Sequence, residues 1–182
     1  PMGSLEELLS REDIQVVSIC TPSGAHAEPA TAAAQQGKHL MVEKPLEVTL
    51  ERADLIIRAV ERSGVRLTCM FPLRYMIGPR YVRQACMEGR LGQLTLADAY
   101  IKWHRSQQYY ENSWRGTWKL DGGGALMNQS IHNIDLLQWL VGPVRMVFGQ
   151  TDTLVRQIET EDTAVAVIRF GCGAMGTIQG AT

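Results

Sequence analysis

Short apolar runs recur along the first part of the chain. The segments "IQVVSIC" (14–20), "KHLMVE" (38–43) and "VRLTCMF" (65–71) are dominated by apolar residues and are too short for a helix of ordinary length. Runs of this kind are typical of parallel strands that are covered on both faces of the sheet. We therefore expect three strands here, each buried from both sides.

Amphipathic stretches separate these runs. Residues 26–37 are rich in alanine and end at a glycine, and residues 49–64 carry apolar side chains on one face behind an N-capping Thr49. A capping box that begins at Ser4 predicts a shorter helix before the first strand. The order β-α-β-α-β indicates parallel strands joined by right-handed crossovers. Residues 1–75 are therefore predicted to be α/β, the C-terminal part of a Rossmann-type dinucleotide-binding domain.

The pattern changes after about residue 78. The expected elements are, in order, a helix (79–88), a long alternating strand (94–104), an irregular aromatic loop (105–121), a helix (124–140) and three strands (144–152, 163–170 and 174–180). Successive strands joined by short turns favour a mostly antiparallel, open sheet with helices on one face. Residues 76–182 are therefore predicted to form a second, α+β domain that serves substrate binding and oligomerisation.

Three glycines near the end of the chain have the spacing of a dinucleotide-binding fingerprint. The stretch "FGCGAMGT" (170–177) contains G-x-G-x-x-G. A true fingerprint follows a strand and opens a helix, whereas the residues after these glycines are strand-like. We interpret Gly171-Cys172-Gly173 as a hairpin turn between antiparallel strands.

Composition excludes several classes of function. The chain has 182 residues, a formal net charge of -1 and four cysteines without a C-x-x-C pair. The near-neutral charge gives no support to nucleic-acid or membrane-surface binding, and the cysteine spacing suits free thiols in a reducing cytoplasm better than disulfides or zinc. No apolar run is long enough to cross a bilayer, and no signal peptide is evident.

Polar residues follow each predicted strand of the first domain. Parallel strands bring their carboxyl ends to one edge of the sheet, where open α/β sheets bind ligands. This places five residues near one crevice: Thr21, Pro22, His26, Lys44 and Arg74. Lys44 stands out, because it directly follows a strand and precedes Pro45, so its backbone is biased toward an extended form. The alternative is a set of ordinary polar loops, with Lys44 a solvated surface lysine.

A second cluster lies in "DGGGALMNQSIHNID" (121–135). Consecutive glycines at a helix entrance let backbone N–H groups approach a ligand closely. Asn128 and His132 are four residues apart and share a helix face, and Asp135 lies on the same side, where it can orient His132. The alternative is a histidine that is satisfied within an apolar core.

These two clusters resemble the Gfo/Idh/MocA family of oxidoreductases. The resemblance rests on "VVSICTPSGAHAEPATAAAQQGKHLMVEKPLEVT" and "GGGALMNQSIHNIDLLQWLVG". It implies NAD or NADP as cofactor and hydride transfer between the nicotinamide and a hydroxyl-bearing carbon of a sugar or cyclitol. It also implies catalytic roles for Lys44, Asn128 and His132. The residues that it places along the cofactor are Thr21, Pro22, His26, Glu43, Lys44 and Pro45, to which the topology of the sheet adds Arg74.

The chain departs from the family pattern at two positions. Many members have aspartate where this chain has Asn128, and glycine where it has Ser130. An amide cannot take up a proton, so His132 must carry more of the acid–base work. The same feature keeps a second hypothesis open, in which the protein is a non-catalytic sensor of cofactor or sugar.

The aromatic stretch "KWHRSQQYYENSWRGTWKLDGGG" resembles the branch of the family that acts on nucleotide sugars, such as UDP-N-acetyl-amino-sugar 3-dehydrogenases. Tyr109, Tyr110 and Trp114 can stack on a sugar face, and Arg115 can grip a carboxylate or phosphate. Together with Lys44, Asn128 and His132 these residues form the predicted substrate site. The alternative for this stretch is a packed loop that covers the sheet.

The expected glycine fingerprint of a Rossmann domain does not precede Ile14. We therefore expect this chain to be part of a protein about twice as long, and expect the isolated chain to bind cofactor poorly and to be inactive. The open sheet of the second domain has an edge that needs covering, which predicts a homo-oligomer, a dimer or tetramer, formed through that sheet.

Overall fold

The structure is a computed structural model that describes residues 3–182 and divides into two compact units. The first contains residues up to Met70 together with Trp118–Gly122, and the second contains Phe71–Thr117 and Gly123–Thr182. The division falls five residues before the boundary that we predicted between 75 and 76. Residues 118–122 belong with the first unit, where the Gly24 N–H donates to the Leu120 carbonyl at 2.9 Å.

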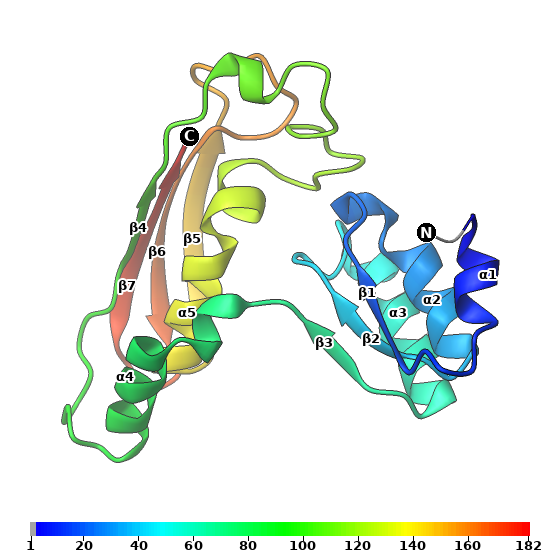
Figure 1. The fold of residues 1–182 in the computed structure, drawn as a ribbon. Helices are drawn as coiled ribbons and strands as arrows, with labels where there is room; N and C mark the ends of the chain where they lie inside the picture. Colours follow the sequence, from blue (N-terminus) through cyan, green and yellow to red (C-terminus); the bar gives the residue numbers. More distant parts are fainter. Residues whose placement is uncertain (1–2) are drawn as a thin grey trace. The chain divides into compact units, whose positions relative to one another are not determined.

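The first unit is the predicted parallel sheet with helical crossovers (Figure 1). Its strands lie in the order β1-β2-β3, and both neighbouring pairs are parallel, with Ile19 opposite Val42 and Val42 opposite Cys69. The elements of this unit are α1 (Leu5–Leu9), β1 (Val16–Ile19), η1 (Ser23–Ala25), α2 (Ala27–Gln35), β2 (His39–Val42), α3 (Leu50–Ser63) and β3 (Leu67–Cys69).

Helices α1 and α3 of the first unit begin at the capping residues that the sequence predicts. The Ser4 side chain accepts from the Glu7 N–H, and the Thr49 side chain accepts from the Arg52 N–H. Gly64 ends α3 with a φ of 65°, in the left-handed region that favours glycine. Local side-chain chemistry therefore sets these boundaries, as the sequence predicts.

The sheet of the first unit is covered on one face, which corrects our expectation of burial on both. Along β1 and β2 exposed and buried residues alternate. Val17, Ile19, Leu40 and Val42 form a core with the alanines of α2 and with Ile56 of α3, whereas Val16 is 49% exposed. The apolar composition of the runs did not reveal this difference, because both faces carry apolar side chains.

The second unit is built on a four-stranded sheet in the order β4-β7-β6-β5. The β5–β6 and β6–β7 pairs are antiparallel and β4–β7 is parallel, which agrees with a mostly antiparallel sheet. Its elements are η2 (Pro72–Tyr75), α4 (Ile77–Met87), β4 (Ala99–Lys102), η3 (Gln107–Tyr109), η4 (Ala125–Ser130), α5 (Ile131–Val141), β5 (Val144–Asp152), β6 (Thr163–Phe170) and β7 (Met175–Ala181).

Two elements of this unit differ from their predicted form. The strand expected over 94–104 is regular only in β4, and Leu96 adds a single bridge to Met175. The helix expected from 124 to 140 begins with the six-residue η4, which is π-helical, before the α-helical α5.

The glycine-rich segment 171–174 is a hairpin turn between β6 and β7, which confirms that interpretation. The Phe170 N–H donates to the Ala174 carbonyl at 2.8 Å, and the Gly173 N–H donates to the Phe170 carbonyl at 3.0 Å. Gly173 has a φ of 95°, which an L side chain rarely adopts.

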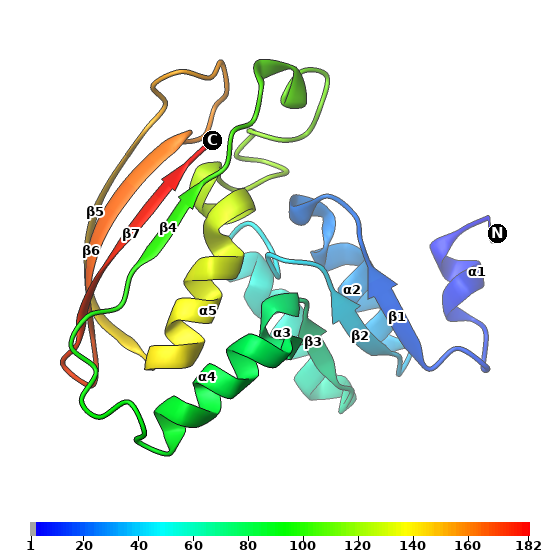
Figure 2. The ribbon, with the colours of Figure 1, turned by 60° about the vertical axis from the view of Figure 1, so that its left-hand side comes forward.

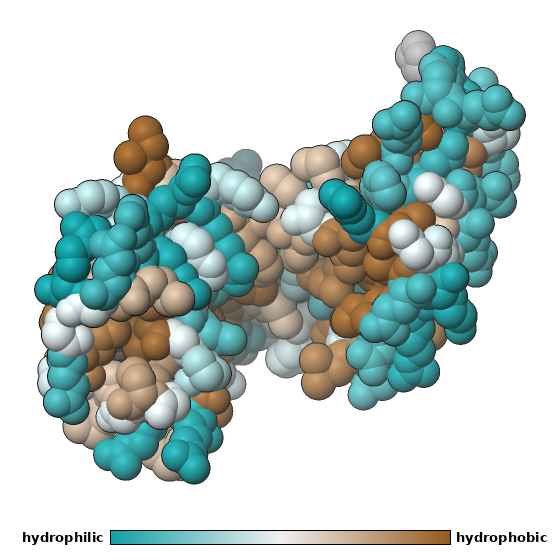
Figure 3. All heavy atoms as spheres, turned by 90° about the horizontal axis from the view of Figure 1, so that it is seen from below, coloured by the Kyte–Doolittle hydropathy of each residue, from teal (hydrophilic) through white to brown (hydrophobic). Residues whose placement is uncertain are grey.

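Helix α5 lies along one face of the four-stranded sheet (Figures 1 and 2). Leu137 of this helix packs with Ile101, Ile168, Phe170 and Ile178 from three strands. The opposite face is open and partly apolar, and it exposes Tyr100, Met146, Phe148, Val165, Val167 and Met175. Apolar side chains reach the surface of both units in Figure 3. Among residues 3–182, no helix is long and apolar enough to span a membrane.

Candidate active site

His26 lies beneath the carboxyl edge of the first sheet. Its ring is 1% exposed. Nε2 lies 2.9 Å from the Thr21 carbonyl oxygen, and Nδ1 lies 3.0 Å from that of Pro45 and 3.3 Å from that of Leu46. Thr21 follows β1 and Pro45 follows β2, so one buried ring contacts both loops. The structure therefore brings together the segments after the first two strands.

The predicted cofactor residues of these loops differ in exposure. Thr21 and Glu43 are exposed, Pro22 and Lys44 are half-buried and Pro45 is buried. The Thr21 hydroxyl donates to the Ala25 carbonyl at 2.9 Å, and a Glu43 carboxylate oxygen accepts from the Lys44 N–H at 3.3 Å. The His26 ring is enclosed by protein, so a direct contact between its side chain and a cofactor stays a prediction.

A buried carboxylate supports the loop after the E-K-P segment. Glu47 accepts from the backbone N–H groups of Ala27 at 3.1 Å and Val48 at 2.7 Å, and it pairs with Arg52 at 2.9 Å. Burial acts to raise the pKa of Glu47, but the hydrogen bonds from Arg52 and these two N–H groups outweigh it and hold the pKa below its ordinary value. Arg52 also pairs with Glu28 of α2 at 3.0 Å. This ionic cluster ties α2, α3 and the loop together.

Arg74 lies in the second unit and forms a two-bond ion pair with Asp135. Arg74 Nε donates to Asp135 Oδ2 at 2.7 Å, and its Nη2 donates to Oδ1. The guanidinium also lies 5.6 Å from the ring centroid of Phe71 and 5.9 Å from that of Trp139. We expected Asp135 to orient His132, and the structure gives its carboxylate to Arg74 instead.

His132 stands in the first turn of α5, and its ring meets Phe71 edge to face. The ring centroids are 6.1 Å apart at an interplanar angle of 78°. Asn128 lies four residues earlier in η4, where its Oδ1 accepts from Gln129 Nε2 at 3.4 Å. Both predicted catalytic residues of this unit are half-buried, the state expected of side chains that contact a bound ligand.

The π-helical form of η4 has a visible local cause. The Ser130 hydroxyl donates to the Ala125 carbonyl, five residues earlier, at 2.7 Å. Ser130 is fully buried, and a Cβ on Gly180 would stand 2.7 Å from its Oγ. The position where many family members have glycine therefore holds a hydroxyl that bonds the wider turn. Single π-helical turns are frequent at functional sites.

The N–H groups at the entrance of this helix are occupied by the protein itself. The Glu161 carboxylate accepts from the N–H groups of Gly124 at 2.9 Å and Leu126 at 2.8 Å, and the Glu161 carbonyl accepts from Ala125 at 2.8 Å. A Cβ on Gly124 would stand 1.8 Å from that carbonyl oxygen. The expected ligand nest at these glycines is therefore filled by residue 161, which carries the negative charge that a helix start attracts.

In the aromatic loop the structure separates packing residues from candidate ligands. The Tyr110 ring is buried and its hydroxyl lies 3.1 Å from Thr182 Oγ1, so the packed-loop alternative describes this position. The guanidinium of Arg115 lies 4.8 Å from the Tyr109 ring centroid and 5.0 Å from that of Trp114. Its only hydrogen bonds within the described part of the chain go to Ser113.

Arg105 is a candidate that the sequence did not single out. Its guanidinium lies 5.3 Å from the Tyr109 ring centroid, and its Nη2 donates to Gln129 Oε1 at 3.0 Å. Within residues 3–182 neither Arg105 nor Arg115 forms an ion pair with a carboxylate. Two unpaired guanidiniums near one tyrosine suit an anionic ligand. The sequence signal that could have identified Arg105 is the alternation of arginines with aromatic residues in the aromatic stretch.

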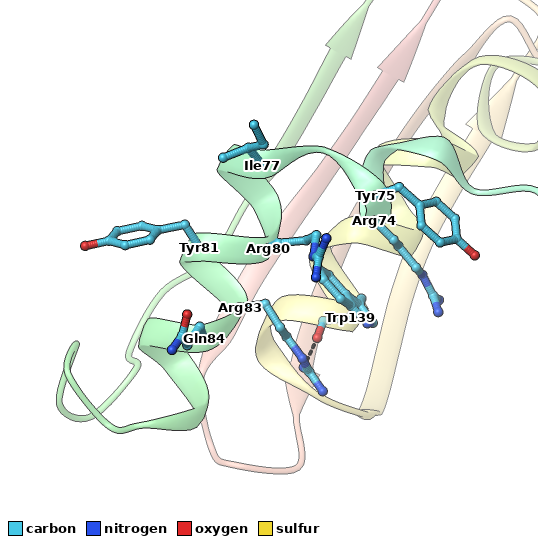
Figure 4. Close-up of a pocket in the computed structure, with 8 residues that line it drawn as sticks. All are labelled: Arg74, Tyr75, Ile77, Arg80, Tyr81, Arg83, Gln84 and Trp139. Carbon is cyan, nitrogen blue, oxygen red and sulfur yellow. Dashed lines mark hydrogen bonds between the residues drawn. The ribbon is translucent and has the colours of Figure 1, made fainter.

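A surface hollow lies over α4 and the end of α5, away from the aromatic loop (Figure 4). Its volume is about 840 Å³, and it is lined by Arg74, Tyr75, Ile77, Arg80, Tyr81, Arg83, Gln84 and Trp139. Figure 4 shows Tyr81 directed away from Trp139, and Arg83 bonded to the Trp139 carbonyl. Neither His132 nor Asn128 lines this hollow, so its size does not identify it as the site of the chemistry.

Family models match almost the whole chain. The "Oxidoreductase family, NAD-binding Rossmann fold" matches residues 1–71, and the "GFO/IDH/MocA C-terminal domain" matches residues 80–182. The chain therefore belongs to the Gfo/Idh/MocA family, as the E-K-P loop and the glycine-rich helix predicted.

Individual relatives are enzymes of sugar metabolism by name. The chain is 28% identical to levoglucosan dehydrogenase of Pseudarthrobacter phenanthrenivorans, over 94% of this chain and 50% of the relative. It is 30% identical to 1,5-anhydro-D-fructose reductase of Ensifer adhaerens, over 94% of this chain and 52% of the relative. The chain thus spans about half the length of the curated relatives that it matches.

Solved structures give a stronger likeness. The WlbA dehydrogenase from Bordetella pertussis, in complex with NADH and UDP-GlcNAcA, is 40% identical with a TM-score of 0.94, over 100% of this chain and 52% of that one. The WlbA enzyme from Chromobacterium violaceum, in complex with the same two ligands, is 35% identical with a TM-score of 0.92, over 98% of this chain and 52% of that one.

Proposed function

We propose that the protein containing this chain is an NAD(P)-dependent dehydrogenase that acts on a hydroxyl-bearing carbon of a sugar, with an anionic nucleotide sugar as the favoured substrate class. The observation that carries the proposal is the similarity of the entire chain to half of a dehydrogenase held with NADH and UDP-GlcNAcA. Family membership and the presence of both the E-K-P loop and the N-x-x-x-H helix support it.

The residues of the first unit fit the polar part of a nicotinamide nucleotide. A hydroxyl, a carboxylate and an ammonium group, from Thr21, Glu43 and Lys44, stand on two loops that contact the same His26 ring. These loops lie at the carboxyl edge of a parallel sheet, where dinucleotides bind in this fold. When bound there, NAD(P) supplies the acceptor for the hydride.

His132 and Lys44 divide the remaining chemistry. His132 acts as general base and removes the proton of the reacting hydroxyl, a role suited to an imidazole near neutral pH. Lys44 donates a hydrogen bond to the same oxygen and stabilises the negative charge that develops on it. Asn128 positions the sugar by hydrogen bonds, since its amide cannot take a proton. In the reverse direction, protonated His132 returns the proton to the same oxygen.

The two unpaired arginines support an anionic substrate. Arg115 and Arg105 both lie within reach of the Tyr109 ring, and no carboxylate of the described residues pairs with either. We assign Arg115 and Arg105 to a carboxylate or phosphate of the sugar, with Trp114 providing an apolar wall. Tyr110 supports Tyr109, because its ring packs edge to face on the Tyr109 ring with the centroids 5.0 Å apart.

The test is an assay of the intact protein with NAD+ or NADP+ and a panel of sugars. UDP-GlcNAcA, UDP-GlcNAc and free neutral sugars should be supplied in parallel, while the absorbance of reduced nicotinamide is followed. We expect turnover with UDP-GlcNAcA, and weaker turnover both with UDP-GlcNAc, which lacks the sugar carboxylate, and with the free neutral sugars. A protein that binds cofactor and sugar by calorimetry but reduces no nicotinamide would instead support the sensor hypothesis, which Asn128 keeps open.

We further propose that the open face of the β4–β7 sheet is an interface between copies of the protein. It exposes six large apolar side chains across four strands, including Phe148 at 68% and Val167 at 50%. Exposed apolar surface of this kind marks association sites. Light scattering on the intact protein should show a dimer or tetramer, and Phe148→Lys should shift it toward the monomer. A wild-type monomer would refute this assignment.

A further inference from the structure

We infer that His26 is a positioning residue that fixes where Lys44 stands relative to the loop after β1. This inference rests on the proposed function, because it concerns the placement of its lysine. Nothing in the family match or in the relatives' names assigns His26 such a role.

The ladder between β1 and β2 ends just before Lys44. Its last bond runs from the Glu43 N–H to the Ile19 carbonyl at 3.0 Å. Beyond that point the His26 ring takes over, with Nδ1 at 3.0 Å from the Pro45 carbonyl oxygen and Nε2 at 2.9 Å from that of Thr21. Lys44 is therefore the one residue between two fixed backbone points.

No other donor in the described part of the chain reaches the Thr21 or Pro45 carbonyl. Both oxygens can only accept, so each is bonded only when the ring nitrogen that faces it carries a proton: one nitrogen in the neutral imidazole, both in the imidazolium. The imidazole is also nearly sealed from solvent, at 1% exposed, so water cannot replace it easily. An apolar side chain here would leave two carbonyls near the protein interior without a donor.

Nearby charges hold the same region from the other side. Glu47 bonds the Ala27 N–H, directly after His26 in the chain, and pairs with Arg52. This cluster anchors the loop two residues beyond Pro45, and Arg52 Nη2 also donates to the Gly24 carbonyl in the loop after β1, at 3.3 Å. The His26 ring is the contact that lies nearest to Lys44, because it joins the Thr21 carbonyl to that of Pro45, the next residue after Lys44.

Two conservative variants separate the two contacts. The amide nitrogen of asparagine overlays Nδ1 of histidine, and that of glutamine overlays Nε2. His26→Asn therefore keeps a donor for Pro45, and His26→Gln keeps a donor for Thr21. In the intact protein we expect kcat of His26→Asn within about threefold of wild type, with a raised KM for cofactor. We expect His26→Gln to keep the cofactor KM and to lose about tenfold or more in kcat, because small misplacements of catalytic groups are costly.

Lys38→Met is the matched control. Lys38 is also buried, at 8% exposed, and its Nζ donates to a backbone carbonyl, that of Arg11, at 2.7 Å. It directly precedes β2, at the end of that strand opposite to Lys44. Its loss should lower the melting temperature as the His26 variants do, and leave kcat and both KM values unchanged.

The inference can be tested even if the dehydrogenase proposal fails. The rate at which acetic anhydride modifies Lys44, followed by mass spectrometry, reports its placement without turnover. His26→Gln should change that rate severalfold, and His26→Asn should not. Identical behaviour of the two variants, in kinetics or in Lys44 modification, overturns the inference. If neither variant folds, the ring N–H protons of wild-type His26 should still exchange slowly with solvent by NMR, and fast exchange overturns it.

Discussion

Arg74 Nε donates to Asp135 Oδ2 at 2.7 Å, and a second bond joins the same two side chains. The pair connects η2, which follows the first sheet in the chain, to α5, the helix that carries His132. Asp135 is largely buried, with its side chain 11% exposed, whereas that of Arg74 is 40% exposed. The carboxylate thus holds the helix of the proposed base in place without bonding to the base itself.

Replacement of Asp135 by asparagine should therefore lower stability more than it alters chemistry. The change leaves the Arg74 guanidinium without its anion, at a cost of about 1.5–3 kcal/mol for a lost charge-assisted hydrogen bond. The free energy of unfolding, measured with denaturant, checks this. The pH dependence of kcat should keep the midpoint of the wild type, and a shifted midpoint would restore Asp135 as the partner of His132.

Gly124→Ala should be strongly destabilising. A Cβ at this position would stand 1.8 Å from the Glu161 carbonyl oxygen, which is backbone and cannot turn aside. Overpacking of this kind costs about 1–3 kcal/mol or more. Gly78→Ala in α4 is the control, because a Cβ built there has no atom within 4 Å apart from its chain neighbours and the backbone of its own helix. Thermal unfolding should show a lowered melting temperature for the first variant and little change for the second.

Asp162 should make the protein less stable in acid. Burial acts to raise its pKa, but N–H groups of Arg156, Leu154 and Val155 and the Thr163 hydroxyl outweigh it and hold the pKa below its ordinary value of 3.8. The stabilisation is therefore complete above the unfolded pKa and is lost as pH falls from there through the lower folded pKa. Between neutral pH and about pH 3, the free energy of unfolding should fall less steeply for Asp162→Asn than for the wild type. Parallel curves for the two proteins would contradict this.

Much of the fold could be predicted, because its causes are local. Thr49 and Gly64 set the bounds of α3. The strand-like residues after Gly173 indicated that Gly171 and Gly173 belong to a turn rather than to a cofactor-binding loop. Parallel topology then brought the loops of Thr21 and Lys44 to one edge. These inferences needed only neighbours in sequence or the general rules of α/β sheets.

The errors at the candidate site involve contacts between residues far apart in the chain. The Glu161 carboxylate accepts from the Gly124 N–H, 37 residues away in the sequence. Arg74 donates to the Asp135 carboxylate, 61 residues away. No local pattern announces such pairs. The sequence also did not predict that the first sheet is buried on one face only, because composition gives no information on which helices cover which face.

Arg115→Met should weaken the binding of an anionic sugar more than that of a neutral one. Without the guanidinium the carboxylate or phosphate loses a charge-assisted hydrogen bond, so KM for UDP-GlcNAcA should rise about tenfold or more. KM for a neutral sugar should stay within about twofold. Arg105→Met should behave in the same way if both arginines serve one ligand. Steady-state kinetics with the two substrates checks this, and an equal effect on both would assign the arginines to packing.

The most direct test of the account is the turnover number of His132→Ala in the intact protein, measured with saturating cofactor and sugar. Removal of a general base lowers turnover by about 10²-fold or more. We predict such a fall in kcat, with cofactor affinity unchanged by calorimetry. A variant that turns over at the wild-type rate would contradict the assignment of His132 as the base.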